Sequence, residues 1–413
     1  MLRNYLLTSY KVMMRRKLFT GINLLCVVLT LTILLVVTAL LDFAFRPSGV
    51  EGRSERFLQV TTMEMRDKDG RQSGNLGYKV IDKYLRPMKS AVLVAAVSSS
   101  QPVAVYQADK VSTFGLRRTD ASYWDIMDFT LLAGRVPSAG DVTEGRFVAV
   151  INAATARQLF PGPVAMAIGK TIPADGQQFT VIGVVEGGVH INSSGDIWVP
   201  VTTFPSSSYR DEMWGNFTAL LMAKSAEGLP AIRQEVRAIS AGILLNESGK
   251  PVTTRMSAES KVDMFASMLL PRQKSTEPAG ATLLGWIVSL MLLFMLLPAL
   301  NLVNLNTGRI MERSVEIGVR KAFGATSTQL VGQLIVENVV LCLVGGAISL
   351  ALVAATLWGL KHSALLPGLE IGINLAVFGY GLLITVLFGL LSGVIPAWTM
   401  SRLDPVFALK GAA

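Results

Sequence analysis

Cysteine and histidine are scarce in this sequence, which contains two of each among 413 residues. Cys26 and Cys342 lie inside apolar runs, whereas His190 and His362 lie in separate segments. The two residue types therefore cannot form a cluster with metal-ligand spacing, and the polar regions cannot form a disulfide of their own. One histidine per polar region also argues against a Ser/His/Asp or Cys/His catalytic site, and we expect His190 to be a surface loop residue.

A phosphate-binding loop is also missing, because no GxxxxGKS or GxxxxGKT motif occurs. These residues are therefore not expected to hydrolyse ATP, and no enzymatic activity is predicted for them. Charged residues make up only 16% of the chain, hydrophobic residues 51%, and the mean hydropathy is +0.47. Such a composition is too apolar for an ordinary soluble protein and too charged to lie wholly in lipid, so we expect a chain divided between water and membrane.

Four apolar runs are long enough to cross a bilayer, which takes about 20 residues. We place these spans at 18–42, 281–305, 330–360 and 371–398. The first run follows a basic segment, as the apolar region of a signal peptide does. It is longer than the roughly 7–15 residues of such a region and has only a poor cleavage site, so we interpret it as a retained span.

The basic residues set the predicted orientation, because cytoplasmic loops are enriched in Lys and Arg. The formal net charge is +9, and the positive residues gather at the ends of the apolar runs, so they indicate membrane topology and not a nucleic-acid partner. Segments 1–17, 306–329 and 399–413 are predicted to be cytoplasmic, and 43–280 and 361–370 extracytoplasmic. The outer loop 361–370 has Lys361 alone, whereas the segments 306–329 and 399–413 contain six basic residues: Arg309, Arg313, Arg320, Lys321, Arg402 and Lys410.

The long polar block 43–280 reads as a mixed α+β domain. Runs such as SAVLVAAVS and QFTVIGVVEG are β-branched and bounded by turn residues, while 229–245 has apolar residues at helical spacing. We expect a further helix over 256–270, whose apolar residues share one face and which leads into the second span. The predicted fold is thus an integral membrane α-helical protein of four transmembrane helices, with a large α+β extracytoplasmic domain between helices 1 and 2.

The segment 306–329 between the second and third spans is distinctive. Glu316 and Arg320 have the spacing of a helical ion pair, Ile317 gives the segment an apolar side, and Gly324 can end the helix. The pattern alone fits a basic interfacial turn that fixes topology or a docking element for a cytosolic motor. Glu337 lies inside the third apolar run, where an ionisable side chain is costly; we favour structural pairing with Arg320 or Lys321 over a relay of protons or substrate.

The sequence resembles the MacB/FtsX-type ABC transporter permeases in three places. The run MERSVEIGVRKAFGATSTQLVGQLIVENVV is similar to the family signature between the second and third spans, and IPAWTMSRLDPVFALK is similar to its C-terminal pattern. In the outer block, DASYWDIMDFTLLAGRVPS and the runs that follow it resemble a MacB-type periplasmic core domain. The signature matches at Glu312, Arg313, Glu316, Ile317, Gly318, Arg320, Ala322, Gly324, Ala325, Gln333 and Glu337.

The resemblance implies a dimeric permease in a bacterial cytoplasmic (inner) membrane, with a porter-like outer domain and an inserted β-rich part at about 116–205. It implies no cofactor in this chain, because ATP and Mg would be bound by a separate cytosolic ABC ATPase dimer. The second permease would be another copy or a relative, and a membrane fusion protein and an outer-membrane channel are further candidate partners. The ATPase-coupling residues implied are Glu312, Arg313, Glu316, Ile317, Arg320, Lys321, Gly324 and Ala325.

Three functions stay open at this point. The first is a permease that couples ATP hydrolysis to movement of its outer domain and exports or extracts a peptide, a lipoprotein or another amphiphile. The second is an FtsX-like signalling permease that controls a cell-wall hydrolase. The third is a membrane scaffold without a motor. No nucleic-acid partner is expected for any of them.

Overall fold

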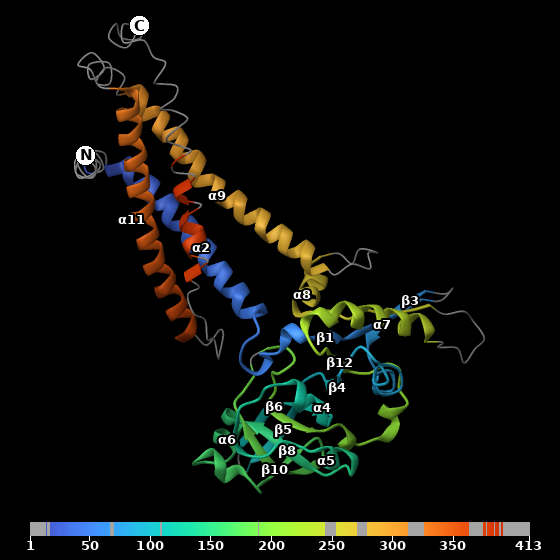
Figure 1. The fold of residues 1–413 in the computed structure, drawn as a ribbon. Helices are drawn as coiled ribbons and strands as arrows, with labels where there is room; N and C mark the ends of the chain where they lie inside the picture. Colours follow the sequence, from blue (N-terminus) through green and yellow to red (C-terminus); the bar gives the residue numbers. More distant parts are fainter. Residues whose placement is uncertain are drawn as a thin grey trace. The chain divides into compact units, whose positions relative to one another are not determined.

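The computed structural model describes residue 14 and residues 17–66, 70–107, 110–188, 190–243, 253–270, 279–312, 326–362, 375–376, 378–383, 385–387 and 390. The chain forms two compact units, one of Met1–Ala44 with Leu284–Ala413 and one of Phe45–Leu283. Figure 1 shows the long helices of the first unit and the sheets of the second.

Three long apolar helices dominate the first unit: α2 (Lys17–Phe45), α9 (Ala279–Glu312) and α11 (Ser327–His362). Their stretches Thr20–Phe45, Ala279–Leu296 and Ile335–His362 are long and apolar enough to cross a membrane. A shorter apolar helix, Phe378–Leu387, falls within the predicted fourth span. The fold is therefore that of a multi-pass membrane protein, whereas the count of four spans stays a prediction.

Two neighbouring glycines allow close packing within this unit. A Cβ atom at Gly345 would lie 2.7 Å from Cγ1 of Val27 on α2, and one at Gly346 would lie 2.6 Å from Cδ1 of Leu382. Small residues at such positions let membrane helices approach closely. Val27 also packs with Leu31 and Leu341 in a small apolar cluster. Gly345 thus lies where α11 contacts α2, and Gly346 lies where α11 contacts the helix Phe378–Leu387.

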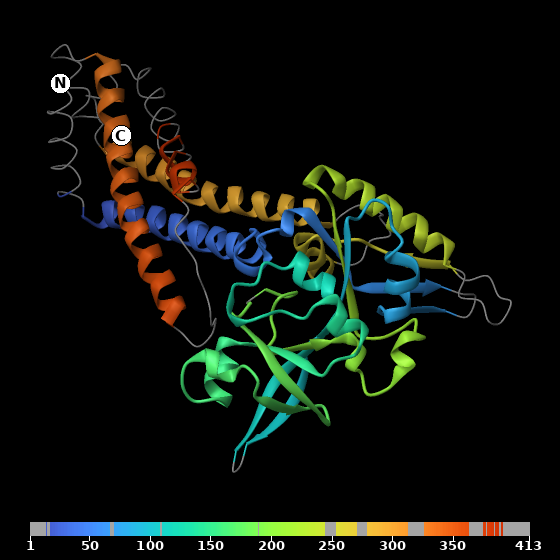
Figure 2. The same cartoon turned by 60° about the horizontal axis from the view of Figure 1, so that its bottom comes forward.

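The second unit is built on a mixed ten-stranded sheet (Figure 2). Its pairings are antiparallel except for β8 with β10 and β6 with β11, which are parallel. The strand order is β1 (Phe57–Val60), β12 (Phe217–Met222), β4 (Leu93–Ser98), β6 (Lys110–Thr119), β11 (Ile197–Pro200), β8 (Val148–Asn152), β10 (Gln177–Val185) and β7 (Leu131–Gly134), with β5 (Gln101–Gln107) on β6 and β9 (Thr171–Ala174) on β10.

A second, three-stranded sheet and several short helices complete this α+β domain. The small sheet has the order β13 (Thr253–Met256), β2 (Thr62–Arg66) and β3 (Arg71–Asn75). The α-helices are α3 (Tyr78–Val80), α4 (Ala121–Ile126), α5 (Ala139–Thr143), α6 (Ala153–Leu159), α7 (Leu229–Gly242) and α8 (Lys261–Leu269), and Ile81–Leu85 (η3) forms one π-helical turn. The 3₁₀ turns are η1 (Gly49–Glu51), η2 (Ser54–Arg56), η4 (Val164–Ala167), η5 (Val201–Thr203), η6 (Ser207–Arg210) and η7 (Ala226–Gly228).

The large sheet is apolar on both faces because its strands point alternate side chains into different members of a set of three apolar cores. Along β1, Leu58 and Val60 belong to the core that also contains Ile232 and Val236 of α7, whereas Phe57 belongs to a core with Tyr123 and other residues of α4. A strand points successive side chains to opposite faces. Gln59 therefore faces the same side of the sheet as Phe57.

The predicted inserted part at about 116–205 begins within β6, which pairs with other strands on both sides. That this part is a separate unit stays a prediction.

The expected helix over 256–270 is wrong in its first part. Met256 ends strand β13, which pairs with β2, and helix α8 begins only at Lys261. A capping box sets this start: the Ser260 hydroxyl accepts from the Asp263 backbone N–H, and the Asp263 carboxylate accepts from the Ser260 N–H. Such a box satisfies helix donors that otherwise have no partner. The strand pairing of Met256 and this cap together override the apolar pattern.

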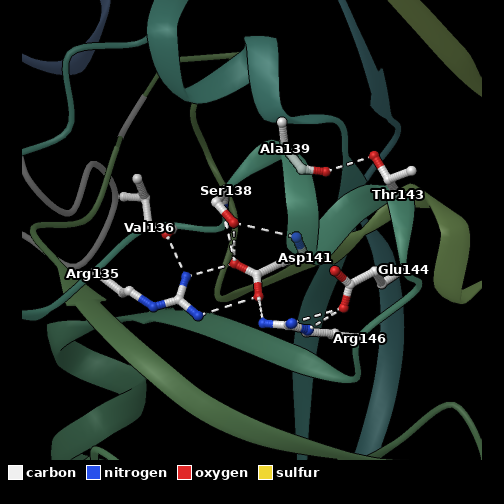
Figure 3. A network of polar contacts seen from close by, with 8 residues as sticks. All are labelled: Arg135, Val136, Ser138, Ala139, Asp141, Thr143, Glu144 and Arg146. Carbon is white, nitrogen blue, oxygen red and sulfur yellow. Dashed lines mark hydrogen bonds and ion pairs between the residues drawn. The ribbon is translucent and has the colours of Figure 1, made fainter.

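Asp141 begins the short helix α5 by a similar box with Ser138 and gathers two arginines around a fully buried carboxylate (Figure 3). Its Oδ2 lies 2.5 Å from the Arg135 guanidinium, and its Oδ1 lies 3.3 Å from that of Arg146. The hydrogen bond from Arg135, which is the largest cause, and those from the Ser138 N–H and hydroxyl lower the pKa of Asp141 below its usual range, although burial opposes the shift. Both arginines are about half exposed, so water screens the pairs and reduces what they contribute.

We expect Asp141→Asn to make the outer domain less dependent on pH under acid conditions. A carboxylate with a lowered pKa in the folded state stabilises that state fully above its unfolded pKa of about 3.9, and loses this contribution as the pH falls toward the folded pKa. At pH 7 the substitution should cost about 1 kcal/mol through the damaged helix cap. Thermal unfolding of the full chain in detergent, measured between pH 3 and 7, checks this. An equal acid sensitivity of the variant and the wild type would contradict it.

Candidate functional site

The second unit contains the two points where the outer domain continues into apolar helices. The chain leaves α2 at Phe45 and enters the domain through η1, and it returns through α8 to the start of α9 at Ala279. Buried polar side chains from both connections meet here. We call Glu51, Gln59, His190, Asn192 and Lys261 the junction.

A buried ion pair forms the centre of the junction. Oε2 of Glu51 lies 2.6 Å from Nζ of Lys261, and the two side chains are 0% and 9% exposed. The other carboxylate oxygen, Oε1, accepts hydrogen bonds of 3.1 Å from the backbone N–H groups of Asn192 and Ser193. Buried charges persist in proteins when they are paired and hydrogen-bonded. Glu51 thus ties the entry segment both to the loop around 192 and to the helix before α9.

Gln59 adds a second link between the same segments. Its Oε1 accepts a 2.7 Å hydrogen bond from Nδ2 of Asn192, and its Nε2 donates to the Met264 sulfur on α8. Its backbone exchanges two 2.8 Å hydrogen bonds with Glu259. The strand that follows the first apolar helix is therefore joined to the segment that precedes the second.

The loop that carries His190 and Asn192 is held from several sides. The Tyr123 hydroxyl donates to the Asn192 carbonyl at 2.9 Å, and an Arg117 guanidinium nitrogen donates to the Ile191 carbonyl at 2.7 Å. Burial lowers the pKa of the Arg117 guanidinium and raises that of the Tyr123 phenol, so the phenol keeps its proton at neutral pH. The loop is thus a fixed part of the domain.

The expectation that His190 is a surface residue is wrong. Its side chain is buried, with only 8% of the residue exposed, and its Nε2 lies 3.1 Å from the hydroxyl of Ser48. Burial, together with the positive charge of Lys261, lowers the pKa of His190, and Glu51 opposes the shift. Because Ser48 is distant in sequence, no local pattern could indicate this contact.

Asp263 connects helix α8, which begins with Lys261 of the junction, to the first turn of α9. Its Oδ2 lies 2.9 Å from the Arg233 guanidinium of α7, and its Oδ1 accepts a 3.0 Å hydrogen bond from the backbone N–H of Gly280. A Cβ atom at residue 280 would lie 2.6 Å from that oxygen and 3.0 Å from Cγ1 of Val262. The approach of the two helices therefore depends on glycine.

We expect Gly280→Ala to lower the stability of the outer domain by about 1–3 kcal/mol, the usual cost of crowding a packed site. The matched control is Gly285→Ala in the same helix, where an added Cβ meets nothing within 4 Å. The control should be neutral or slightly stabilising, since alanine is the better helix former. Thermal unfolding of both full-length variants in detergent compares them. Equal behaviour of the two variants would refute a close contact at residue 280.

The sequence-predicted coupling residues lie at the edge of the described structure or outside it. Glu312 is the last residue of α9, and Arg313, Glu316, Ile317, Arg320, Lys321, Gly324 and Ala325 lie outside the described residues. Glu337 lies on α11 and is 2% exposed, next to the equally buried Asn338. Its proposed pairing with Arg320 or Lys321 stays a prediction. Among the described residues, no group of three or more His, Cys, Asp or Glu side chains is placed to hold a metal ion.

The long apolar helices and the α+β domain together define the class of protein as a multi-pass membrane protein with a large polar domain. Two family models match the chain: the MacB-like periplasmic core domain over residues 20–239 and the FtsX-like permease C-terminal domain over residues 288–405. The first alone covers more than half of the chain. The chain therefore belongs to the MacB/FtsX-type permease family, as the sequence resemblance predicted.

Several curated proteins are similar to this chain. The macrolide export ATP-binding/permease protein MacB of Salmonella choleraesuis (strain SC-B67) is 27% identical over 290 residues, which are 70% of this chain and 42% of the relative. MacB of Escherichia coli (strain K12) has the same identity and coverage. The chain thus matches less than half the length of these relatives.

Two solved structures are similar to about half of the chain. The extracellular domain of the noncanonic ABC-type transporter YknZ from Gram-positive bacteria is 17% identical, with a TM-score of 0.35, and the match covers 47% of this chain and 98% of that domain. The periplasmic region of MacB from Actinobacillus actinomycetemcomitans is 16% identical, with a TM-score of 0.35, and the match covers 52% of this chain and 94% of that region.

Proposed function

We propose that this chain is the transmembrane permease of an ABC transporter complex and passes movement of its spans to its outer domain. The observation that carries the proposal is the junction, in which Glu51 and Lys261 join the segment after the first apolar helix to the segment before the second. A displacement of either span is then delivered to the same buried contacts. Family membership supports the permease role.

The energy for that movement would come from ATP, bound with Mg by a cytosolic ABC ATPase dimer. These 413 residues contain no phosphate-binding loop, and the segment 306–329 has the charge pattern of a docking element. We infer that the protein lies in the inner membrane of a bacterial cell. It crosses this membrane four times, and both termini are cytoplasmic. A second permease, either another copy or a relative, completes the complex.

The cargo that fits this design is a peptide, a lipoprotein or another amphiphile that reaches the outer domain without crossing an aqueous pore. Coupling between ATP and the outer domain requires two states in which the ATPase makes different contacts with the permease. A membrane fusion protein and an outer-membrane channel would extend an export route. No cofactor of this chain is required.

Purification tests the proposal. The full chain, tagged and extracted in mild detergent from its native cells, should bring down a P-loop ATPase whose hydrolysis rate changes when the permease is present. A variant with 306–329 replaced by a Gly/Ser linker of equal length should insert into the membrane yet recover no ATPase. If the wild-type chain recovered no P-loop ATPase, the motor-coupled function would be wrong and a scaffold role would replace it.

A further inference from the structure

Helix α8 has its polar and apolar sides reversed for a helix at the surface of a water-soluble domain. Asp263 and Lys261 face inward, where they are paired with Arg233 and Glu51. The outward face is apolar: Phe265, Met268 and Leu269 are 42%, 68% and 60% exposed. In water the arrangement is normally the opposite.

These three residues form one continuous stripe. Positions i, i+3 and i+4 lie side by side on a helix, so Phe265, Met268 and Leu269 share one face. Single apolar residues scattered over a surface need no explanation. A continuous apolar stripe on a helix that buries its charged side chains indicates that the outward face of the helix does not contact water.

Phe45 and Gly280, where the second unit continues into the apolar helices α2 and α9, both contact α8. The ring of Phe45, the last residue of α2, lies edge-on to the ring of Phe265 with centroids 5.5 Å apart. At the other connection, the Gly280 N–H in the first turn of α9 donates to Asp263 at 3.0 Å. The helix is thus in contact with the outer ends of two candidate spans.

The distance from those ends to the hydrocarbon core is short. Phe19–Leu41 is uncharged and is followed by Asp42. At 1.5 Å per residue, Phe45 lies about 6 Å beyond Leu41. The headgroup layer on each side of a bilayer is about 5–8 Å thick, so the ring contact of Phe45 and Phe265 falls within it.

We propose that α8 is an interfacial helix that inserts Phe265, Met268 and Leu269 into the outer leaflet, at the boundary between phospholipid headgroups and acyl chains. The outer domain then rests on the membrane through a lipid contact in addition to its two chain connections. Any tilt of the domain must withdraw or deepen this apolar stripe.

Site-directed fluorescence tests the proposal on the full chain. In a cysteine-free background (Cys26→Ala, Cys342→Ala), Met268→Cys is labelled with an environment-sensitive dye and reconstituted into phosphatidylcholine and phosphatidylglycerol vesicles. The matched control is Met166→Cys in η4, a methionine that is also exposed, at 60%. Leu269→Cys provides a second probe of the same stripe, in case the first variant folds poorly.

We expect the labels at 268 and 269 to emit at shorter wavelength than the label at 166. They should lose most of their emission to a lipid with a nitroxide near its headgroup and be protected from aqueous iodide, whereas the label at 166 shows the reverse. Equal access of iodide to all three labels would overturn the proposal. Protection of 268 and 269 from both quenchers would overturn it as well, because the stripe would then be covered by protein, such as a second copy of this chain.

Discussion

Lys261→Met is expected to lower the stability of the outer domain by about 3–5 kcal/mol, because it leaves the fully buried Glu51 carboxylate without its counter-ion. For a domain of this size, each kcal/mol lowers the thermal midpoint by about 2–4 °C. Thermal unfolding of the full chain in detergent, followed by near-ultraviolet circular dichroism, measures the loss. The matched control is Lys224→Met on the exposed surface, which should stay within about 0.5 kcal/mol of the wild type.

A loss of stability in Lys261→Met could come from the unpaired Glu51 charge or from lost packing of the lysine methylene groups. The double variant Glu51→Gln with Lys261→Met separates these two explanations. It removes both charges but keeps an amide oxygen that can accept the hydrogen bonds from the backbone N–H groups of Asn192 and Ser193. Replacement of a whole buried pair is often nearly neutral, so most of the lost stability should return. If the double variant were as unstable as Lys261→Met, the methylene packing of the lysine would explain the loss, and an uncompensated Glu51 charge would not.

Glu316→Lys is expected to abolish transport-coupled ATP hydrolysis while membrane insertion stays intact. The substitution reverses a charge in the segment that we propose as the docking site of the ATPase, and like charges at a close interface cost several kcal/mol. The measurement is the ATPase rate of the purified complex with and without cargo. Glu186→Lys, the same reversal on the exposed outer domain, should leave that rate unchanged.

A compensating variant shows whether Glu316 acts on the partner or only on its own helix. Glu316 and Arg320 have the i, i+4 spacing of an ion pair, and Glu316→Lys with Arg320→Glu restores opposite charges at those positions. A docking role predicts that the double variant stays uncoupled. Full recovery of cargo-stimulated hydrolysis would reduce Glu316 to a stabiliser of its helix, and wild-type behaviour of the single variant would remove it from the mechanism altogether.

The elements with a simple apolar pattern could be predicted from the sequence. The run 229–245 contains α7, and SAVLVAAVS and QFTVIGVVEG contain β4 and β10, because their periodic or β-branched side chains fill the cores. Strand β6 was missed because KVSTFGLRRT carries two adjacent arginines. In the fold, Arg117 and Arg118 are buried and have partners in distant loops, Ile191 and Asp175 among them.

The junction could not be predicted, because its members come from three distant segments. Glu51 and Asn192 are brought together only by the tertiary fold, and each looks like an ordinary polar loop residue in its own segment. The one local signal was the spacing of Ser260 and Asp263, which is that of a capping box and marks the true start of α8. Buried polar contacts between distant segments leave no periodic pattern in the amino-acid sequence, so they cannot be predicted from it.

Fluorescence resonance energy transfer between two dyes on one chain tests most directly whether the junction passes movement from the spans to the outer domain. Donor and acceptor dyes are placed at Met166→Cys on the domain and Lys361→Cys at the end of α11, both exposed, in the cysteine-free background and in complex with the ATPase. We predict that a non-hydrolysable ATP analogue changes the transfer efficiency, and that Lys261→Met removes this change while ATP is still bound. A transfer efficiency that ATP does not alter, or that ATP alters equally in Lys261→Met, would contradict the account.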